Sequence, residues 1–229
     1  MVKIGLISDI HSNLAALEAV LNDMPKVDRV ICAGDLVGYG AEPNEVVELV
    51  RSKGIQVVMG NHDYAVMTKD VSDLKSVAAE AALWTSRKLS PENIHYLSTL
   101  PTQLRLKVGK SRLYVVHGSP RDNLGEYIFP DISNQELSQL IGELEEDIII
   151  LGHTHRPMKR MILGKLVVNP GGVGQPRDRN PKAGYAVLAI DGDVDAEIKR
   201  VEYDIESTAK KIMAAGLPEE LADRLFFGW

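Results

Sequence analysis

The sequence predicts an α/β protein in which two mixed β-sheets pack together and helices flank them. Over residues 3–59, short apolar runs alternate with amphipathic helical segments, which is the order typical of a parallel, doubly wound sheet. Later in the chain, apolar runs are joined by tight glycine turns, as in antiparallel hairpins. One strongly twisted mixed sheet would satisfy the same pattern.

The prediction of parallel strands in the first half of the chain depends on three apolar runs and two helix starts. Strands are expected at Lys3–Ser8, Val27–Ala33 and Ile55–Met59, because each is a short apolar run that ends at polar residues or glycine. Asn13 and Pro43 are typical helix-start residues, and each precedes an apolar stripe at helical spacing.

The second half is expected to contain the hairpins. A helical region over residues 72–100 comes first, and a later helix runs from a cap at Ser133 to about Glu146. One or two helices follow Asp204. Because no repeat or linker interrupts the chain, residues 1–229 are expected to form one domain with a helical tail from about residue 205. The expected strands of this half are Leu104–Val108, Arg112–Val116, Ile148–Leu151, Met158–Leu163, Leu166–Val168, Ala183–Ile190 and Glu197–Tyr203.

Composition limits the possible functions. The chain has 229 residues, of which 45% are hydrophobic and 25% charged, and these ordinary values exclude a disordered or collagen-like chain. The single cysteine, Cys32, cannot close an internal disulfide or build a cysteine-based zinc site, and it favours a reducing, cytoplasmic location. The net charge of −6 argues against an open basic surface for long nucleic acid. The apolar run Met1–Ile7 is too short for a signal-peptide core, and no membrane segment is expected.

Polar residues gather where the expected strands end. Ligands bind just beyond the carboxyl ends of strands in open α/β sheets, and five of the six histidines occupy such positions. Buried polar side chains at the ends of so many strands would destabilise the fold unless hydrogen bonds or a metal ion compensated for their loss of contact with water. A metal site is the favoured interpretation, and a hydrogen-bonded polar cleft without metal is the alternative. The strand-end residues are Asp9, His11, Asp35, Asn61, His62, Asp63, His117, His153 and His155.

The residue types narrow the choice of metal. Imidazole and carboxylate groups without thiolate suit Mn, Fe, Zn, Ni or Co better than Ca or Mg. The candidate ligands are more numerous than one tetrahedral ion needs, whereas two ions that share a bridging carboxylate would use them all. Such ions, about 3.5–4 Å apart, polarise a phosphoryl oxygen and generate hydroxide from bound water.

In this order, the strand-end blocks resemble the signatures of the calcineurin-like metallophosphoesterase superfamily. The family blocks are D-x-H, G-D, G-N-H-[ED], a later H, and G-H-x-H, and all of them occur between Asp9 and His155. Asn169-Pro170-Gly171 is similar to a further block, whereas residues after about Tyr203 lie outside the resemblance. The resemblance implies a four-layer sandwich of two mixed sheets flanked by helices, with a dinuclear metal site at one edge.

The resemblance also implies a role for each block residue. Asn61 and His62 would contact the phosphate, His62 would assist departure of the leaving group, and Asp63 would support His62. Many relatives carry Glu in place of Asp63, and many have a supporting carboxylate where this chain has Gly38. The implied metal ligands are Asp9, His11 and His155 for one ion, Asn61, His117 and His153 for the other, and Asp35 as the bridge.

The activity implied by the resemblance is hydrolysis of a small phosphodiester or phosphomonoester. A hydroxide that bridges two divalent transition-metal ions would attack the phosphorus, with manganese the first choice of metal and Fe, Ni, Co or Zn as alternatives. A nuclease, a protein phosphatase and a non-catalytic metal-binding scaffold are the other interpretations. The scaffold is disfavoured because no ligand position is degraded.

Arginines outside the blocks are candidates for the substrate pocket. Arg177 is the main candidate for substrate binding, because a guanidinium group matches phosphate oxygens. Arg121 and Arg179 are weaker candidates. Tyr39 and Asn44 are expected to pack and to cap a helix rather than to bind substrate.

The chain ends in Phe226-Phe227-Gly228-Trp229, which holds three of its twelve aromatic residues. Docking on the core is the expected role of this end. A dimer contact, and therefore a homo-oligomer, or a flap over the pocket are the alternatives. Tyr127–Phe129 could wall the substrate cleft, and His95 is expected on the surface of a helix.

Overall fold

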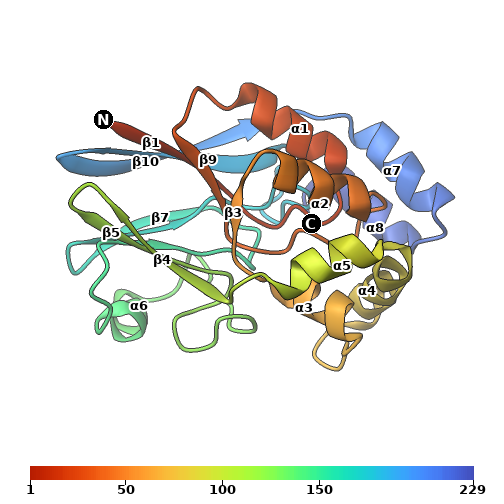
Figure 1. Cartoon of the computed structure of the whole chain (residues 1–229), viewed down its shortest axis with the longest axis horizontal. Coiled ribbons are helices and arrows are strands. Elements are labelled where there is room, and N and C mark those ends of the chain that lie inside the picture. Colours follow the sequence, from red (N-terminus) through yellow and green to blue (C-terminus); the bar gives the residue numbers. More distant parts are fainter.

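The computed structural model describes all 229 residues and contains two five-stranded sheets (Figure 1). The first sheet has the order β10–β9–β1–β2–β3, formed by β1 (Val2–Ile7), β2 (Arg29–Cys32), β3 (Gln56–Val57), β9 (Ala183–Asp191) and β10 (Asp193–Val201). The second has the order β4–β5–β6–β8–β7, formed by β4 (Gln103–Val108), β5 (Ser111–Val116), β6 (Ile148–Ile150), β7 (Met158–Ile162) and β8 (Lys165–Asn169). Both sheets are mixed, since β1 is parallel to β2 and antiparallel to β9, and β5 is parallel to β6 and antiparallel to β4. The fold class is confirmed, and the alternative of one twisted sheet is wrong.

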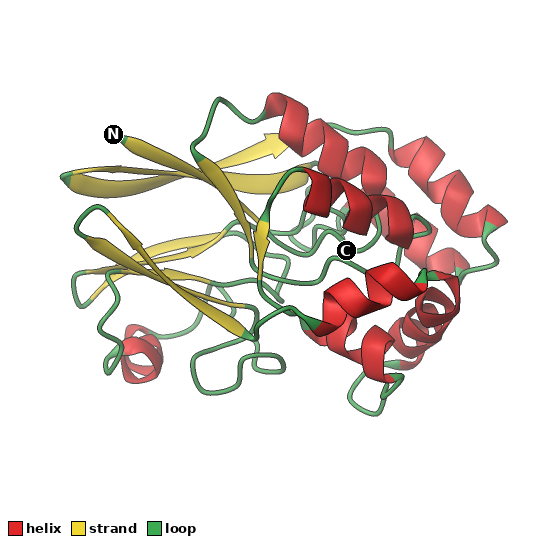
Figure 2. Cartoon of the chain, viewed as in Figure 1, coloured by secondary structure: helices red, strands yellow, loops and turns green.

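Side-chain alternation along the strands creates the layers. Ile4 and Leu6 of β1 belong to the cluster of 16 buried residues that also includes Leu113 and Ile150 of the second sheet. Ile7, on the opposite face of β1, belongs to the cluster of 24 buried residues that packs against helices. Helices therefore flank a sandwich of two sheets, as Figure 2 shows.

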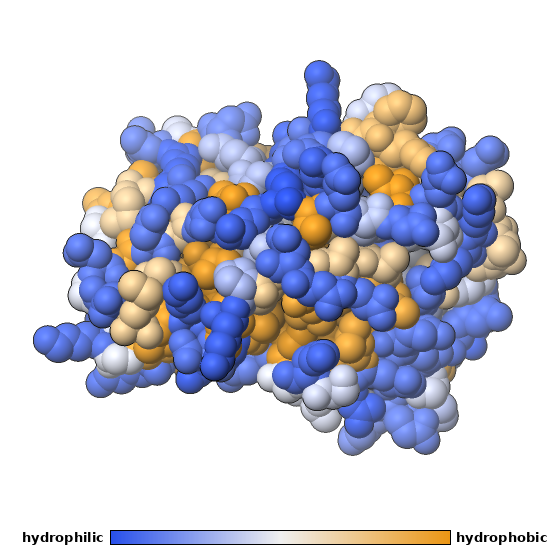
Figure 3. All heavy atoms as spheres, turned by 90° about the horizontal axis from the view of Figure 1, so that it is seen from above, coloured by the Kyte–Doolittle hydropathy of each residue, from blue (hydrophilic) through white to orange (hydrophobic).

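Eight helices complete the fold. The helices α1 (Leu14–Asp23), α2 (Pro43–Ser52), α3 (Asn61–Thr68), α4 (Ser76–Lys88), α5 (Pro91–Ser98), α6 (Asn134–Ile141), α7 (Ile205–Ala214) and α8 (Glu219–Phe227) follow in chain order. α1 and α2 cover the first sheet, whereas α6 packs on the outer face of the second. Hydrophilic side chains dominate the face shown in Figure 3, with hydrophobic side chains in patches between them. No helix has the length and apolarity needed to cross a membrane.

The expected helix starts agree with the structure. The Asn13 side chain accepts the Ala16 N–H at 3.1 Å and caps α1, and Pro43 is the first residue of α2. Ser133 caps α6 in a reciprocal pair with Glu136. The single cysteine, Cys32, is buried in β2 and forms no disulfide.

Several boundaries differ from the expectation. α6 ends at Ile141 rather than near Glu146, because Gly142 follows and the buried Glu146 carboxylate forms an ion pair with the half-exposed Arg105. β10 begins at Asp193 rather than Glu197, because the hairpin turns at Gly192 alone and pairs Asp193 with Asp191. The second and third strands are shorter than their apolar runs, and α3 was not expected.

α7 and α8 form the expected helical tail. They pack on α4 through a cluster of nine buried residues that includes Leu221 and Ala81. The Trp84 indole of α4 donates a hydrogen bond to the Ala215 carbonyl at 3.1 Å. The assignment of residues 1–229 to one domain stays a prediction.

Candidate metal centre

The carboxyl ends of β1, β2, β3, β5 and β6 bring the strand-end side chains together at one edge of the sandwich. Backbone hydrogen bonds join the loops; the N–H groups of Ile10 and His11 both donate to the Asp35 carbonyl, at 2.8 and 3.0 Å. Several of these residues have positive φ angles, which cost non-glycine residues free energy and concentrate at functional sites. The strained residues are Asp9 (54°), His11 (49°), Asp35 (56°), His153 (66°) and His155 (55°).

Asp35 lies between two groups of histidines. Its Oδ2 atom is 3.4 Å from His11 Nε2 and 3.3 Å from His117 Nε2. Its Oδ1 atom accepts the His62 N–H at 2.9 Å, which fixes the plane of the carboxylate. The carboxylate can therefore serve both groups at once.

One group lies on the β1 side of Asp35. His11 Nε2 is 3.2 Å from His155 Nε2, and Asp9 Oδ1 is 3.4 Å from the same His155 atom. The two imidazole rings are stacked with centroids 4.8 Å apart. These three side chains present their ligand atoms to one point.

The other group lies on the β5 side. His117 Nε2 is 3.1 Å from Asn61 Oδ1 and 3.1 Å from His153 Nδ1. The structure thus brings together all seven residues that the resemblance implied as ligands, in the two expected sets on either side of Asp35.

Backbone carbonyls fix the tautomers of the four histidines in the two groups, His11, His117, His153 and His155. A carbonyl oxygen only accepts hydrogen bonds, so the ring nitrogen that contacts it carries the proton. The opposite nitrogen then directs a lone pair into the cluster, as in metal-binding histidines. The contacts are His11 Nδ1 to Val37 O (3.0 Å), His117 Nδ1 to Ala33 O (2.7 Å), His153 Nε2 to Gly125 O (3.2 Å) and His155 Nδ1 to Gln175 O (2.5 Å).

The Asp9 carboxylate shows most directly that these residues fit a metal ion. It is 0% exposed, and neither of its oxygens accepts a hydrogen bond. Burial raises its pKa to about 7, which means that its charge is poorly satisfied by the protein alone. A divalent cation within reach of Asp9, His11 and His155 would supply the missing partner.

The electrostatics around Asp35 favour positive charge. Burial would raise the pKa of Asp35, but the neighbouring His117, His62 and His11 hold it well below its usual range. Burial likewise opposes the charged form of His117, yet the Asp35 carboxylate raises the pKa of His117 to about 9. The negative charge that favours a proton there also favours a metal cation.

His62 belongs to neither of the two expected sets, although one of its ring nitrogens lies within 4.8 Å of ligand atoms of His11 and Asp35. Its side chain is 4% exposed, its Nδ1 atom has no hydrogen-bond partner, and burial lowers its pKa to about 4. Gly38 packs against the ring: a Cβ atom there would lie 2.6 Å from His62 Nδ1, and the φ angle of Gly38 is +91°. The glycine that replaces the common carboxylate is therefore needed for this position of His62.

Asp63 supports the site through the backbone. Its Oδ1 and Oδ2 atoms accept the N–H groups of Val37 (3.1 Å) and Gly60 (3.0 Å), rather than contacting the His62 ring. Asp63 joins the loop after β2 to the start of α3. An acidic residue three positions after the residue that precedes a helix is typical of helix starts, and Asp63 stands in this position relative to Gly60 at the start of α3.

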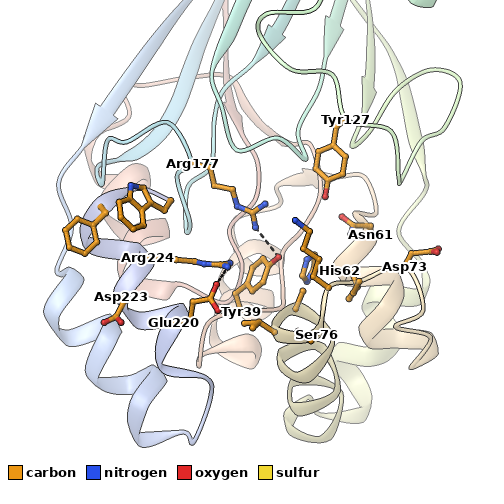
Figure 4. Close-up of a pocket in the computed structure, with 16 residues that line it drawn as sticks. Tyr39, Asn61, His62, Asp73, Ser76, Tyr127, Arg177, Glu220, Asp223 and Arg224 are labelled. Carbon is orange, nitrogen blue, oxygen red and sulfur yellow. Dashed lines mark hydrogen bonds and ion pairs between the residues drawn. The ribbon is translucent and has the colours of Figure 1, made fainter.

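A cavity of about 1080 Å³ opens beside the metal centre. Asn61, His62 and Arg177 line it (Figure 4). The Arg177 guanidinium donates to Tyr39 Oη at 3.0 Å and to Gln175 Oε1 at 2.9 Å. The expected placement of Arg177 in the pocket agrees with the structure.

Tyr39 lines the same cavity, which the sequence did not indicate. Its φ angle is +56°, and its ring lies 4.6 Å from the His11 ring and 4.4 Å from the His62 ring. The expectation that Tyr39 only packs is wrong, because its hydroxyl holds Arg177. Asn44 instead joins α2 to the α4–α5 connection through Lys88 and Ser90.

Of the remaining candidate residues outside the C-terminal end, only Tyr127 lines the cavity. Tyr127 walls the cavity and stacks on His153 with centroids 3.7 Å apart. Arg121 pairs with Glu126 away from this cavity, and Arg179 is exposed and does not line it. His95 is exposed on α5, as expected.

The chain is similar to known proteins over most or all of its length. A family model for the calcineurin-like phosphoesterase superfamily domain matches residues 2–193. An uncharacterized protein of Methanocaldococcus jannaschii is 40% identical over 249 residues, with 100% of both chains covered. Phosphodiesterase YfcE of Escherichia coli K12 is 26% identical over 206 residues, which are 85% of this chain and 90% of that one. The crystal structure of a metallophosphoesterase from Sphaerobacter thermophilus shares 37% identity and a TM-score of 0.85, covering 100% of this chain and 99% of that one. The chain therefore belongs to the calcineurin-like phosphoesterase superfamily.

Proposed function

We propose that this protein is a phosphoesterase that uses two divalent transition-metal ions, manganese first among them, to hydrolyse a small phosphodiester or phosphomonoester. The observation that carries the proposal is the position of Asp35 Oδ2, 3.4 Å from His11 and 3.3 Å from His117. A carboxylate so placed can bridge two ions. The two ions would supply a hydroxide nucleophile and neutralise the charge that develops on the phosphoryl oxygens.

His62 and Asn61 are proposed to handle the phosphate. His62 is neutral at pH 7, because burial lowers its pKa to about 4, and a neutral imidazole can donate one hydrogen bond to the leaving oxygen. Asp63 acts on His62 indirectly, since it fixes the backbone from which α3 starts. Asn61 is proposed to serve twice, as a ligand and as a contact to the phosphate.

Arg177 is proposed to orient the substrate. Gln175 and Tyr39 hold its guanidinium in place, so little rotamer entropy is lost when an anion binds. The fixed positive charge also explains how an acidic protein of net charge −6 can attract a phosphate ester.

Paired substitutions test the proposal. With bis(p-nitrophenyl) phosphate as substrate, His62→Ala is expected to keep its metal content and to lose about 10²–10⁴-fold in turnover. Asp35→Ala is expected to lose metal together with activity. His95→Ala on exposed α5 is the matched control. Full activity of His62→Ala would contradict its assigned role, and full metal content of Asp35→Ala would contradict the bridge.

Small esters are favoured over macromolecular substrates. The cavity is walled by Tyr127 and α8, and its volume of about 1080 Å³ suits a small ligand, so long DNA and membrane surfaces are not proposed as partners. The buried single thiol of Cys32 supports a cytoplasmic location. Hydrolysis of duplex DNA or a phosphopeptide faster than of small diesters would replace this proposal by a nuclease or a protein phosphatase. Absence of any hydrolysis by the metal-loaded protein would favour a scaffold.

A further inference from the structure

The cavity beside the metal centre is much larger than a phosphate group requires. Its volume of about 1080 Å³ is at the upper limit of small-molecule pockets, which are about 300–1,000 Å³. His62, Asn61 and Arg177 occupy only one part of its wall. The rest of the cavity must face another part of the ligand.

The distal wall comes from α8 and α4. α8 and Trp229 line one side, and the first turn of α4 lines the opposite side (Figure 4). α8 lies beyond residue 193, where the match to the family model ends, whereas α4 lies within the matched residues. The family model therefore does not describe the side of the cavity that α8 forms.

Two aromatic side chains of this wall are stacked and exposed. The Phe227 and Trp229 rings have centroids 5.0 Å apart and planes inclined by 29°. They are 54% and 62% exposed, and Phe226 is exposed as well, so the expectation that the aromatic end docks on the core is wrong for all three side chains. Leu221 and Leu225 of the same helix are buried instead. Large aromatic surfaces that border a cavity offer a planar ligand a face on which to stack.

The aromatic pair is held in place by its backbone. Gly228 ends α8 with a φ of +67°, and a Cβ atom there would lie 2.6 Å from the Asn180 backbone. The Gly228 carbonyl accepts the Arg179 N–H at 2.9 Å. This contact fastens the C-terminus to the loop that carries Arg177, so the stacking surface and the phosphate-binding arginine are positioned together.

A polar group near the aromatic pair suits the remainder of a nucleoside. The exposed carboxylate of Asp223, on α8 like Phe227, lines the cavity (Figure 4). Carboxylates accept hydrogen bonds from sugar hydroxyls and from amino groups of bases. Arg224, held by Glu220, points into the middle of the cavity (Figure 4).

We propose that α8 and Trp229 form a nucleoside subsite, in which the base stacks on Phe227 and Trp229 while the phosphate lies toward His62 and Arg177. This inference rests on the proposed function and names the substrate class of the same site: a small ester of a nucleoside phosphate. Base stacking on aromatic side chains is insensitive to the identity of the base, so several nucleosides are accepted.

Binding of two matched ligands tests the subsite. The ligands are the 5′-phosphonates of adenosine and of ribose, whose P–C bond resists hydrolysis, and they differ only in the base. Calorimetry on the metal-loaded protein is expected to give an affinity about 10–100-fold higher for the adenosine compound. Trp229→Ala is expected to remove most of this difference without changing the affinity for the ribose compound.

Phe226→Ala is the matched control. Phe226 is a neighbouring aromatic of α8 that is 43% exposed but lines a different surface groove, with Met213 and Glu206. It is expected to bind both ligands like the wild-type protein. Equal affinity of the wild-type protein for the two ligands, or equal weakening of both by Trp229→Ala, would overturn the subsite.

The hydrolysis assay separates this inference from the proposed function. If the protein hydrolyses bis(p-nitrophenyl) phosphate but does not distinguish the two phosphonates, the subsite is wrong and the phosphoesterase stands. If the phosphonates are distinguished but no ester is hydrolysed with any metal, the subsite stands and the catalytic proposal is wrong.

Discussion

The buried carboxylate of Asp9 is expected to destabilise the protein when metal is removed. In the folded chain its pKa is raised by burial from 3.8 to about 7, which corresponds to about 4 kcal/mol at about 1.4 kcal/mol for each tenfold change. Because the folded state holds the proton more tightly than the unfolded state, the stabilisation by protonation is complete below about pH 3.8 and is lost as the pH rises through about 7. At pH 8 the full penalty applies.

Asp9→Asn removes this charge with little change of shape. The buried amide finds no better hydrogen-bond partners than the carboxylate, and this costs about 1–3 kcal/mol. A net gain of about 1–3 kcal/mol remains, which is about 2–12 °C in the melting temperature of a chain of this size. The same substitution removes a ligand, so the stabilisation by added metal should largely disappear.

Thermal unfolding with EDTA and with Mn²⁺ measures both effects. In EDTA at pH 8, Asp9→Asn should melt above the wild-type protein, and its advantage should shrink as the pH is lowered to 5. With Mn²⁺, the wild-type protein should melt at a higher temperature than Asp9→Asn. Asp131→Asn is the same change at an exposed site. It should change the free energy of unfolding by no more than about 0.5 kcal/mol, with EDTA or with Mn²⁺. A lower midpoint for Asp9→Asn in EDTA, or a metal response equal to that of the wild-type protein, would refute this reasoning.

Three further substitutions probe the supports of the site. Gly38→Ala introduces a Cβ atom 2.6 Å from His62 Nδ1 at a φ of +91°; it should cost about 1–3 kcal/mol and lower turnover without loss of metal, and wild-type turnover would contradict the role of this glycine. Asn169→Ala removes the bonds to the Gly152 carbonyl (2.7 Å) and from the Gly171 N–H (2.9 Å); metal titration should show affinity about 10–100-fold weaker, and unchanged affinity would argue against this support. Leu221→Ala empties a fully buried site between α4, α7 and α8; urea unfolding should show a loss of about 2–5 kcal/mol with normal metal content, whereas loss of metal would mean that the helical tail holds the centre.

The ligand cluster could be predicted from the sequence because of how parallel strands end. Apolar runs are visible in the sequence, and the carboxyl ends of neighbouring parallel strands meet at one edge of a sheet, so Asp9 could be expected beside Asp35, and His117 beside His153. Asn61 and His117 follow strands of different sheets, and only the ordered blocks of the family resemblance placed them in one set.

The substrate pocket could not be predicted in the same way. Tyr39 and Arg177 are 138 residues apart and meet only because the fold brings the loop after β2 against the loop before β9. Tyr39 stands inside a glycine-rich turn, where an aromatic residue gives no periodic signal. The wall formed by Phe227 and Trp229 depends on the packing of α8 against α4, which short amphipathic helices do not specify by themselves. The start of α3 could have been predicted from the Gly60-to-Asp63 spacing. These residues were interpreted only as polar groups that follow a strand.

Crystallography of the manganese-loaded protein, with anomalous scattering recorded at the Mn edge, tests the central proposal most directly. The account predicts two peaks about 3.5–4 Å apart, one beside Asp9, His11 and His155, the other beside Asn61, His117 and His153, with Asp35 between them. A single peak, or two peaks that do not share Asp35, would contradict it.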